Sequence, residues 1–260
     1  MNTTQKVIKT FAICLAALII LSIINGVAHL VTSAFSFNND VNINETYNGD
    51  INNIKIDVGT TNMVIKYGDT FSITAENVSK EFKIKEEGNT LIIKEKNITI
   101  FGNKKSSHTT ITIPNDLNNL SIDIGAGKLE LSDITSNNFS LNQGAGKVVI
   151  TNLISNNTTI DGGTGELHIT SSKLQNLDLD LGAGKCYYNG ILLGNNKIDQ
   201  GVGELILDLY REDYTIKASK GLGSITINGE SYSKDVTVGE GINDIKIDGG
   251  IGSIIINTNK

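Results

Sequence analysis

The sequence predicts an all-β protein: a β-solenoid, or β-helix-like coil, with rungs of about 19 residues, preceded by one N-terminal transmembrane helix. Three observations carry this prediction. A Gly-x-Gly pair recurs through the second half of the chain, apolar and polar residues alternate on both sides of each pair, and one long apolar segment lies near the N-terminus. A fixed period of this length is the sequence signature of a solenoid.

The composition favours strands and turns over helices. The 260 residues include 27 Gly, a single Pro (Pro114) and no Trp, and Ile, Thr, Asn and Val dominate beyond residue 35. The net charge is −6, and only Arg211 among the 22 basic residues is an arginine. Because phosphate contacts need a basic face, we expect no nucleic-acid partner.

The N-terminal segment predicts where the protein resides. Phe11–Val31 is a run of 21 mostly apolar residues, which as a helix spans about the 30 Å of a bilayer core. Lys6 and Lys9 precede it and Asp40 follows it, which places the N-terminus in the cytoplasm. We therefore predict a cytoplasmic N-terminus (1–10), a transmembrane helix (11–31) and a single-pass cell-membrane protein whose C-terminal domain is extracytoplasmic. A signal peptide cleaved near residues 32–34 is the alternative, and it also exports the protein.

The stretch between the apolar segment and the repeats divides in two. Residues 32–50 are polar and Asn-rich, and we expect them to form a tether; residues 51–114 are expected to be an irregular β N-terminal part of the domain. Within it, residues 54–65 match the repeat with Gly59-Thr60-Thr61 in the place of Gly-x-Gly, and so predict a degenerate first rung. Beyond them the period breaks, and the pattern predicts short strands at Phe71–Ala75, Phe82–Glu86, Leu91–Glu95 and Thr109–Ile113.

Residues 115–260 are predicted to be the solenoid repeats. Apolar residues recur five and three positions before the first Gly of each pair and four and six positions after it, so one face of each strand points inward. Successive pairs are 19, 19, 19, 19, 20 and 29 residues apart. The long last step contains residues 229–244, which we expect to fold over the end of the stack, because a bare rung leaves an unpaired edge. The pairs are Gly125 and Gly127, Gly144 and Gly146, Gly163 and Gly165, Gly182 and Gly184, Gly201 and Gly203, Gly221 and Gly223, and Gly250 and Gly252.

These glycines are predicted to be structural turns. Gly-Ala-Gly-Lys at 125, 144 and 182 resembles part of a phosphate-binding loop, but no copy has the spacing GxxxxGK[ST] or GxGxxG. Glycine suits a tight arc that needs positive φ and stacks closely on its neighbours. The sequence predicts no cofactor.

An aspartate column precedes the glycines by two positions. Asp161, Asp180 and Asp199 stand on consecutive rungs, about 4.8 Å apart. Such residues commonly cap turns, and a weak site for a divalent cation such as Ca²⁺ is the alternative hypothesis. Unchanged thermal stability between chelator and millimolar Ca²⁺ would exclude that cation site. Three positions after the glycines the charge alternates, which favours ion pairs between rungs: Lys147, Glu166, Lys185, Glu204.

The side chains show no catalytic constellation, and we expect no enzyme activity. Cys14 and Cys186 lie in neither a lipobox nor a CxxC context, so neither a lipid anchor nor a zinc site is predicted. Tyrosines gather in one region of the chain. Tyr188 occupies a core position. The other three are either ordinary packing residues, which is the commoner case for such tyrosines, or exposed contact residues: Tyr187, Tyr210 and Tyr214.

Together these motifs resemble a known family. The opening IKIDVG with VIKYGD (54–69), the segment ITIPNDLNNLSIDIGAGKLEL (111–131) and the serial GAGK rungs are similar to the bacterial putative adhesin family of β-strand-repeat domains, a domain of unknown function. The resemblance covers about residues 41–260. It implies a β-solenoid outside the membrane, and some relatives are encoded with cell-envelope stress genes of Gram-positive bacteria. The family offers no catalytic motif to transfer.

The sequence therefore predicts a non-enzymatic, membrane-anchored cell-surface β-solenoid that presents a binding surface to an unknown envelope protein or glycan. Two alternatives remain open. One is a regulatory or accessory protein in cell-envelope stress signalling, acting with a membrane sensor kinase. The other is a glycan-active β-helix enzyme using acids such as Asp178 and Asp180. Either way, function is expected on the outward columns or in the aperiodic segments 66–113 and 229–244.

Overall fold

The computed structural model describes residues 41–95, 106–114 and 116–258, which are built of strands, turns and bends. The predicted cytoplasmic N-terminus and membrane helix (1–31), with Cys14, lie outside these residues. Within the described ranges no helix is long and apolar enough to cross a membrane.

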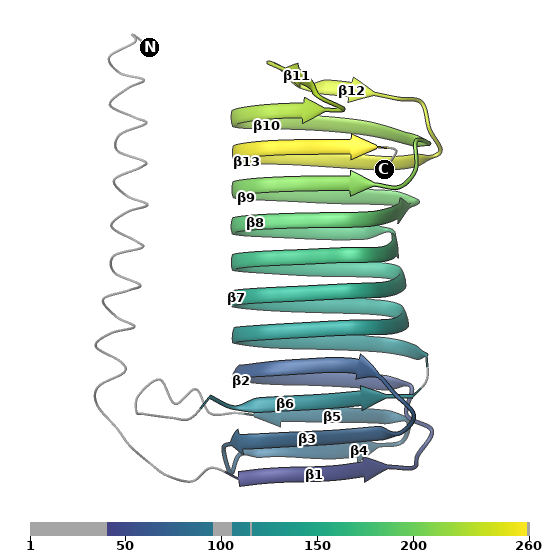
Figure 1. Ribbon diagram of the computed structural model, residues 1–260, viewed down its shortest axis with the longest axis vertical. Coiled ribbons are helices and arrows are strands. Elements are labelled where there is room, and N and C mark those ends of the chain that lie inside the picture. The colour runs from purple at the N-terminus through teal and green to yellow at the C-terminus, as the bar shows by residue number, and fades with distance from the viewer. Residues whose placement is uncertain (1–40, 96–105, 115, 259–260) are drawn as a thin grey trace, which may run out of the picture. The chain divides into compact units, whose positions relative to one another are not determined.

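The repeats coil into a stack of rungs (Figure 1). Each rung has a strand before its Gly-x-Gly arc and a strand after it, and we call the two walls that these strands build the pre-arc wall and the post-arc wall. The arcs line up along the arc edge, and the longer turns form the opposite, wide edge. Neighbouring rungs pair in parallel, as where Asp180 lies opposite Asp161 on one side and Asp199 on the other. The elements that carry arcs are β2 (Asn53–Tyr67), β7 (Leu117–Gln175), β8 (Leu177–Leu193), β9 (Asn195–Leu209), β10 (Tyr214–Ile227) and β13 (Asn243–Thr258).

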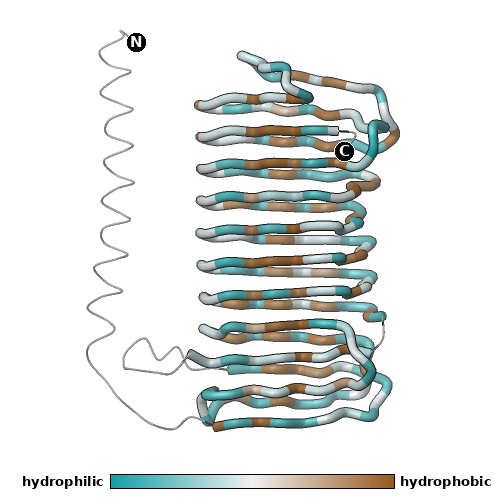
Figure 2. The backbone as a smooth tube through the Cα atoms, in the orientation of Figure 1, coloured by the Kyte–Doolittle hydropathy of each residue, from teal (hydrophilic) through white to brown (hydrophobic). Residues whose placement is uncertain are grey.

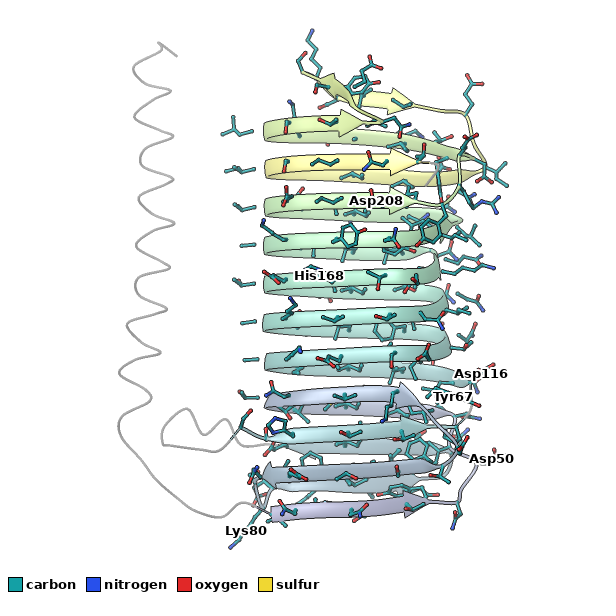
Figure 3. The ribbon with its side chains drawn as sticks, viewed as in Figure 1. Asp50, Tyr67, Lys80, Asp116, His168 and Asp208 are labelled. Carbon is teal, nitrogen blue, oxygen red and sulfur yellow. The ribbon has the colours of Figure 1, made fainter. Side chains whose placement is uncertain are left out.

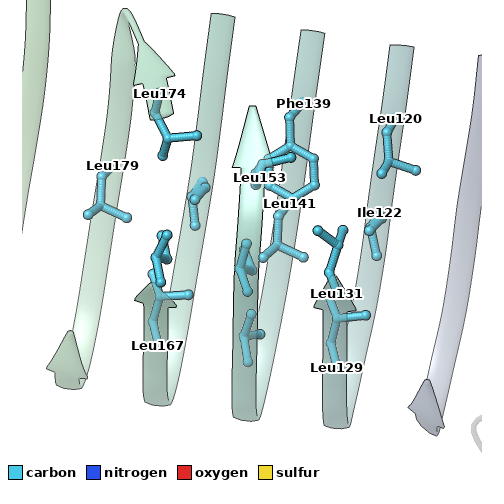
Figure 4. Packing of buried hydrophobic residues seen from close by; sticks show 14 of the residues in the cluster. Leu120, Ile122, Leu129, Leu131, Phe139, Leu141, Leu153, Leu167, Leu174 and Leu179 are labelled. Atoms are coloured by element: carbon cyan, nitrogen blue, oxygen red, sulfur yellow. The ribbon is translucent and has the colours of Figure 1, made fainter. Parts of the chain in front are cut away.

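The core follows the predicted columns. Every residue three positions before, and four and six positions after, the first glycine of a pair from Gly125 onward is buried. Figure 2 shows this alternation along the strands, and Figure 4 shows leucines and isoleucines of successive rungs packing between the two walls. The column five positions before the glycine departs from the prediction at two rungs, where the buried residues are polar: Thr158 and Asn196. Asn196 is satisfied by main chain, since its Oδ1 accepts from the Leu177 N–H at 3.1 Å and its Nδ2 donates to the Asp244 carbonyl at 3.0 Å.

Cys186 occupies one of these core positions, and burial raises the pKa of its thiol from 9.0 to about 12. We expect Cys186 to resist alkylation at pH 8 in the folded protein and to react fully in denaturant, because only the thiolate is nucleophilic. Because the folded pKa lies above the unfolded one, the stability from the neutral thiol is present below pH 9 and declines as pH rises towards 12. Peptide mass spectrometry after iodoacetamide treatment measures the reaction, and equal labelling in both states would show an accessible thiol.

The N-terminal part adds rungs that the sequence hides. As predicted, β2 pairs with the first rung of β7, with Thr60 opposite Ala126. On its other side β2 pairs in parallel with β5 (Thr90–Glu95) before its arc and with β6 (His108–Ile113) after it. These two strands are thus one further rung in which the connection 96–107 replaces the short arc. The period breaks between residues 66 and 113 for two reasons: residues 68–89 intervene before this rung, and the connection 96–107 separates its two halves.

Three antiparallel strands complete this end of the stack. β3 (Phe71–Val78) pairs with β6, β4 (Phe82–Glu87) pairs with β5, and β1 (Val41–Tyr47) pairs with β3. β1 falls within the predicted tether 32–50 but forms a strand, because Ile43 and Tyr47 alternate with polar residues and pack against the core. The Tyr47 ring meets Phe71 edge-on, with centroids 5.7 Å apart.

At the other end the chain order and the stacking order differ. The last strand, β13, lies between β9 and β10 and pairs in parallel with both, so that β9 and β10 are not neighbours. β11 (Glu230–Tyr232) and β12 (Val236–Val238) then pair antiparallel with β10. The segment 229–244 therefore does cover the last rung, as predicted, while the chain returns to fill the position inside it (Figure 1).

Candidate binding face

The Gly-x-Gly residues serve the stacking of the arcs. The second glycine of each pair has positive φ, for example 125° at Gly146. The first glycine of the pair needs space instead: a Cβ on Gly163 would lie 2.2 Å from the Gly144 carbonyl oxygen. Their role in the described arcs is thus conformational, and chemistry has to be sought on the outward side chains.

The prediction that these glycines form turns between strands is corrected in one respect. The parallel ladder skips only the first glycine of each pair and resumes at the residue after it, as where Leu181 pairs with Gln200 and Ala183 with Val202, so the main chain bends within a strand. Every predicted glycine therefore lies within a strand of the stack, in β7, β8, β9, β10 or β13: Gly125, Gly127, Gly144, Gly146, Gly163, Gly165, Gly182, Gly184, Gly201, Gly203, Gly221, Gly223, Gly250 and Gly252.

The last glycines also stack in an order that differs from their order in the chain. Gly223 is the next copy after Gly203 in the sequence, but the two do not pair. Gly252 lies opposite both of them, because β13 is inserted between β9 and β10. A Cβ on Gly252 would lie 1.7 Å from the Gly203 carbonyl oxygen, and one on Gly223 would lie 1.6 Å from the Gly252 carbonyl oxygen. The close approach of the arcs thus holds at this end too, with Gly252 in the middle.

The outward charges form pairs within and between rungs. The predicted inter-rung pairs are present, with Lys147 3.0 Å from Glu166 and Lys185 3.3 Å from Glu204 on the post-arc wall. On the pre-arc wall the Asp column is partly neutralised, because Lys197 binds Asp199. The described residues contain no group of three or more His, Cys, Asp or Glu placed to hold a metal ion. The cation site at Asp161, Asp180 and Asp199 stays a prediction.

The pre-arc wall also carries an asparagine ladder that sequence reasoning missed. Side-chain amides on successive rungs donate to one another, at 2.6 Å from Asn119 to Asn53, 2.8 Å from Asn138 to Asn119 and 3.0 Å from Asn157 to Asn138. The signal was available, since Asn recurs six positions before the first glycine on consecutive rungs. This ladder fixes the register and leaves a hydrophilic wall.

Replacing Asn138 with alanine is expected to cost about 1–2 kcal/mol of unfolding free energy, because it removes hydrogen bonds to both neighbouring rungs. Ser140→Ala, on the same strand and exposed, is the control and is expected to be nearly neutral. Urea unfolding of both variants measures the difference. Equal midpoints would mean that the ladder contributes nothing to stability.

The post-arc wall differs by carrying an apolar stripe along the stack. The stripe lies five positions after the first glycine, between the charged pairs and an outer polar row, and its side chains are partly exposed. Register places each member opposite the next, from His168 to Tyr187, Ile206 and Ile255. Figure 3 views this wall, with His168 near the middle of the stack. We define the post-arc stripe as Val149, His168, Tyr187, Ile206 and Ile255.

The polar neighbours of the post-arc stripe hold its tyrosine in place. The Tyr187 hydroxyl donates to Asp208 Oδ2 at 3.0 Å, and Asn257 Nδ2 donates to the other carboxylate oxygen at 2.7 Å. Partial burial, and then the hydrogen bond to Asp208, raise the pKa of Tyr187, which keeps the hydroxyl protonated as a donor. The His168 ring lies 6.2 Å from the Tyr187 ring, centroid to centroid. These contacts fix a ring on an otherwise flat surface.

The other predicted tyrosines divide between surface and core. Tyr210 is 42% exposed at the wide edge, and its hydroxyl donates to Asn189. Tyr188 is buried, as predicted, and donates to the Ile191 carbonyl at 2.8 Å. Of the two alternatives for Tyr214, packing is the one observed: the side chain is 2% exposed, and its hydroxyl accepts from the Leu192 N–H at 3.3 Å. Its place at the start of β10, beneath the chain that leads into β13, buries it.

A second exposed apolar row lies at the tips of the last arcs. Val202, Ile251 and Leu222 are 50%, 38% and 57% exposed and occupy neighbouring rungs. Earlier tips carry smaller residues, such as Ala126 and Ala183. Both apolar rows depend on the position of β13, which sets Ile255 beside Ile206 and Ile251 beside Val202. Reading the copies in chain order would have placed β10 there instead.

Comparison with known proteins identifies the family. No curated protein matches the chain. Among solved structures, a putative cell adhesion protein from Clostridium sporogenes is 18% identical (84% of this chain and 99% of that chain, TM-score 0.35). A putative adhesin from Bacteroides fragilis is 16% identical (83% and 97%, TM-score 0.47), and a putative lipid binding protein from Parabacteroides distasonis is 16% identical (86% and 98%, TM-score 0.35). The family model described as Toastrack DUF4097 matches residues 51–247, well over half of the sequence, and the chain therefore belongs to the Toastrack DUF4097 family.

Proposed function

We propose that this protein is a non-enzymatic, membrane-anchored scaffold of the cell surface that presents its post-arc wall to another protein of the cell envelope. The observation that carries the proposal is the post-arc stripe, a continuous row of partly exposed apolar and aromatic side chains on one wall only. Contiguous apolar surface on a soluble domain marks interaction sites. The opposite wall carries the Asp column and the asparagine ladder and offers no comparable surface among the described residues.

The rows beside the stripe favour a protein over a glycan as the partner. Lys147, Glu166, Lys185 and Glu204 pair with one another, and Asp208 is bound by Tyr187 and Asn257. Their charges are therefore compensated within the domain, and the tyrosine of the stripe already has a hydrogen-bond partner, whereas sugar binding typically uses several open aromatic platforms. A partner with apolar side chains gains most from this wall, with Tyr187 at its centre, since aromatic anchors dominate protein interfaces.

The rigid stack suits such display. Parallel pairing in register holds the stripe residues at a fixed spacing of about 4.8 Å, so that binding orders few side chains and costs little entropy. The apolar segment 11–31 would tether the domain at the outer face of the membrane. A role in adhesion and a role beside a stress-sensing kinase both use this arrangement, and the identity of the captured partner separates them.

The experiment is a pull-down of the full chain from its own solubilised envelope. The variant Tyr187→Ser/Ile206→Ser alters the stripe on β8 and β9, and Asp178→Ser/Lys197→Ser alters the opposite wall of the same two strands. We expect the stripe variant to lose tenfold or more of the captured partner and the control to retain it. Equal capture by both variants, at equal thermal stability, would refute the proposed surface.

A further inference from the structure

The end of the stack built by β1, β3 and β4 is uneven. β3 and β4 lie at one level, because they pair with β6 and β5, the two halves of one rung. β1 pairs with β3 and so extends the post-arc wall one strand beyond β4. Among the described residues, no strand pairs with the outer edge of β4 or of β1. The post-arc wall therefore projects while the pre-arc wall stops short.

This step forms a groove that has apolar side chains on its inner side and charged side chains around them: Glu81, Lys83, Lys85, Glu87 and Lys94. Ile43 and Glu45 of β1 and Phe82 and Ile84 of β4 line it, and Ile43 and Ile84 are partly exposed although they pack on the core. Unpaired main-chain groups along both strands add hydrogen-bonding capacity. The groove is one strand wide, since it is the height of β1 alone.

We propose that a second copy of this chain fills the groove in a two-fold end-to-end dimer, in which β1 of each copy lies beside β4 of the other. A two-fold axis parallel to the strands exchanges the two walls and inverts the stack. It therefore places β1 of the partner, on the projecting post-arc wall, next to β4 on the shorter pre-arc wall of the first copy. By the same symmetry, β1 of the first copy lies next to β4 of the partner. The contact is isologous, with each copy using the same two strands, as closed dimers require. If both walls ended at the same level, the ends of two copies could meet but could not interlock in this way.

The strand directions and the side-chain patterns of β1 and β4 both agree with this dimer. Val41 lies opposite Val78 and β4 begins shortly after that residue, so β1 and β4 both start at the arc edge and pair in parallel across the axis. The inward residues Val41 and Ile43 then meet Phe82 and Ile84. The outward residues of β1, which lie beside Lys83 and Lys85, are uncharged: Asn42, Asn44 and Thr46.

The same symmetry suits two anchored chains. Because the axis runs along the strands, Val41 of both copies lies at the arc edge. The described parts of both chains thus begin at the same edge of the dimer, which is compatible with anchoring in one membrane. Glu45 opposes tight association, because the same register brings it to Glu86 of the other copy, which lies on the inward face of β4, although the Tyr47 hydroxyl donates to Glu45.

Engineered disulfides test this arrangement in the full chain, with Cys14 replaced by serine. In one copy Asn44 and Lys85 point outward from opposite walls, so the pair Asn44→Cys/Lys85→Cys cannot close within a chain. In the dimer they lie on adjacent strands, within the Cα separation of about 4.4–6.8 Å that a disulfide needs. Asn42→Cys/Lys83→Cys tests the same register two residues earlier along both strands, and Asn44→Cys/Lys197→Cys, with one thiol far along the stack, is the control.

We expect at least one of the first two pairs to yield a reducible covalent dimer in oxidised membranes, at ten times or more the level of the control pair. Sedimentation of the Cys14→Ser chain, without the introduced cysteines, in detergent should independently give twice the chain mass. A chain that sediments as a monomer and shows no cross-link above control, with all introduced thiols reactive, would overturn the proposal. That result would also be the one obtained if residues 31–40 of the same chain filled the groove.

Discussion

Replacing Gly146 with alanine is expected to destabilise the stack by at least about 3 kcal/mol, the range reserved for severe single changes. Gly146 has φ of 125°, which L-residues rarely adopt. A Cβ there would lie 2.0 Å from the Gly127 carbonyl oxygen. That oxygen belongs to the main chain of the adjacent rung, so relief requires breaking the parallel ladder. The same clash is expected at the equivalent glycines along the arc edge. A single substitution is enough to destabilise the stack, because each rung is stabilised by its neighbours.

The neighbouring residue provides the control. Ala145 sits at the tip of the same arc and points to solvent, and the equivalent tip carries threonine at Thr164 and valine at Val202. Ala145→Thr is therefore expected to change stability by no more than about 0.5 kcal/mol. Urea unfolding of both variants measures the contrast. A Gly146→Ala protein as stable as Ala145→Thr would show that the arcs do not stack at this distance.

Replacing Ile256 with aspartate is expected to open the C-terminal end of the stack. Ile256 is 0% exposed in β13, between Ile227 of β10 and Leu207 of β9. Burying an unpaired carboxylate there, and losing the isoleucine, should cost about 4 kcal/mol or more. Because β13 lies between β9 and β10, its loss uncovers both strands together. Ile251→Asp, on the same strand but at an exposed arc tip, is expected to be tolerated.

Hydrogen exchange distinguishes this order from a sequential one. In the Ile256→Asp variant, amides of β9, β10 and β13 should lose protection, while those of β7 keep it. If the rungs stacked in chain order, β10 would still cover β9, and protection of β9 would be unchanged. That outcome would contradict the inserted position of β13.

The core positions of the repeating part were predicted well from the sequence, because every rung has the same alternation of apolar and polar residues. Position by position, the period assigned Leu141, Val148 and Ile150 to the core, and all are buried. It could not assign the order of the last rungs, since β10 and β13 carry the same pattern and differ only in long-range pairing. Nor could it show that β5 and β6 make one rung, because residues 96–107 separate two halves that normally adjoin.

The candidate site was harder to predict for the same reason. The first part of the post-arc stripe could have been predicted, because its residues occupy the same position of consecutive repeats: Val149, His168, Tyr187 and Ile206. Its extension to Ile255 depends on β13 lying next to β9. Tyr214 shows the converse: its local sequence left packing and exposure both open, and the chain that returns into the stack buries it. Local periodicity reports which way a side chain points, but not which segment later covers it.

The most direct test of the proposed function is photo-cross-linking in living cells, with one photoreactive residue at Ile206 or at Lys197. These positions lie on the same element, β9, but on opposite walls, so expression and anchoring are matched. We predict that the probe at Ile206 captures a discrete envelope protein and that the probe at Lys197 does not. Capture from Lys197 without capture from Ile206, or no adduct from either, would contradict binding through the post-arc stripe.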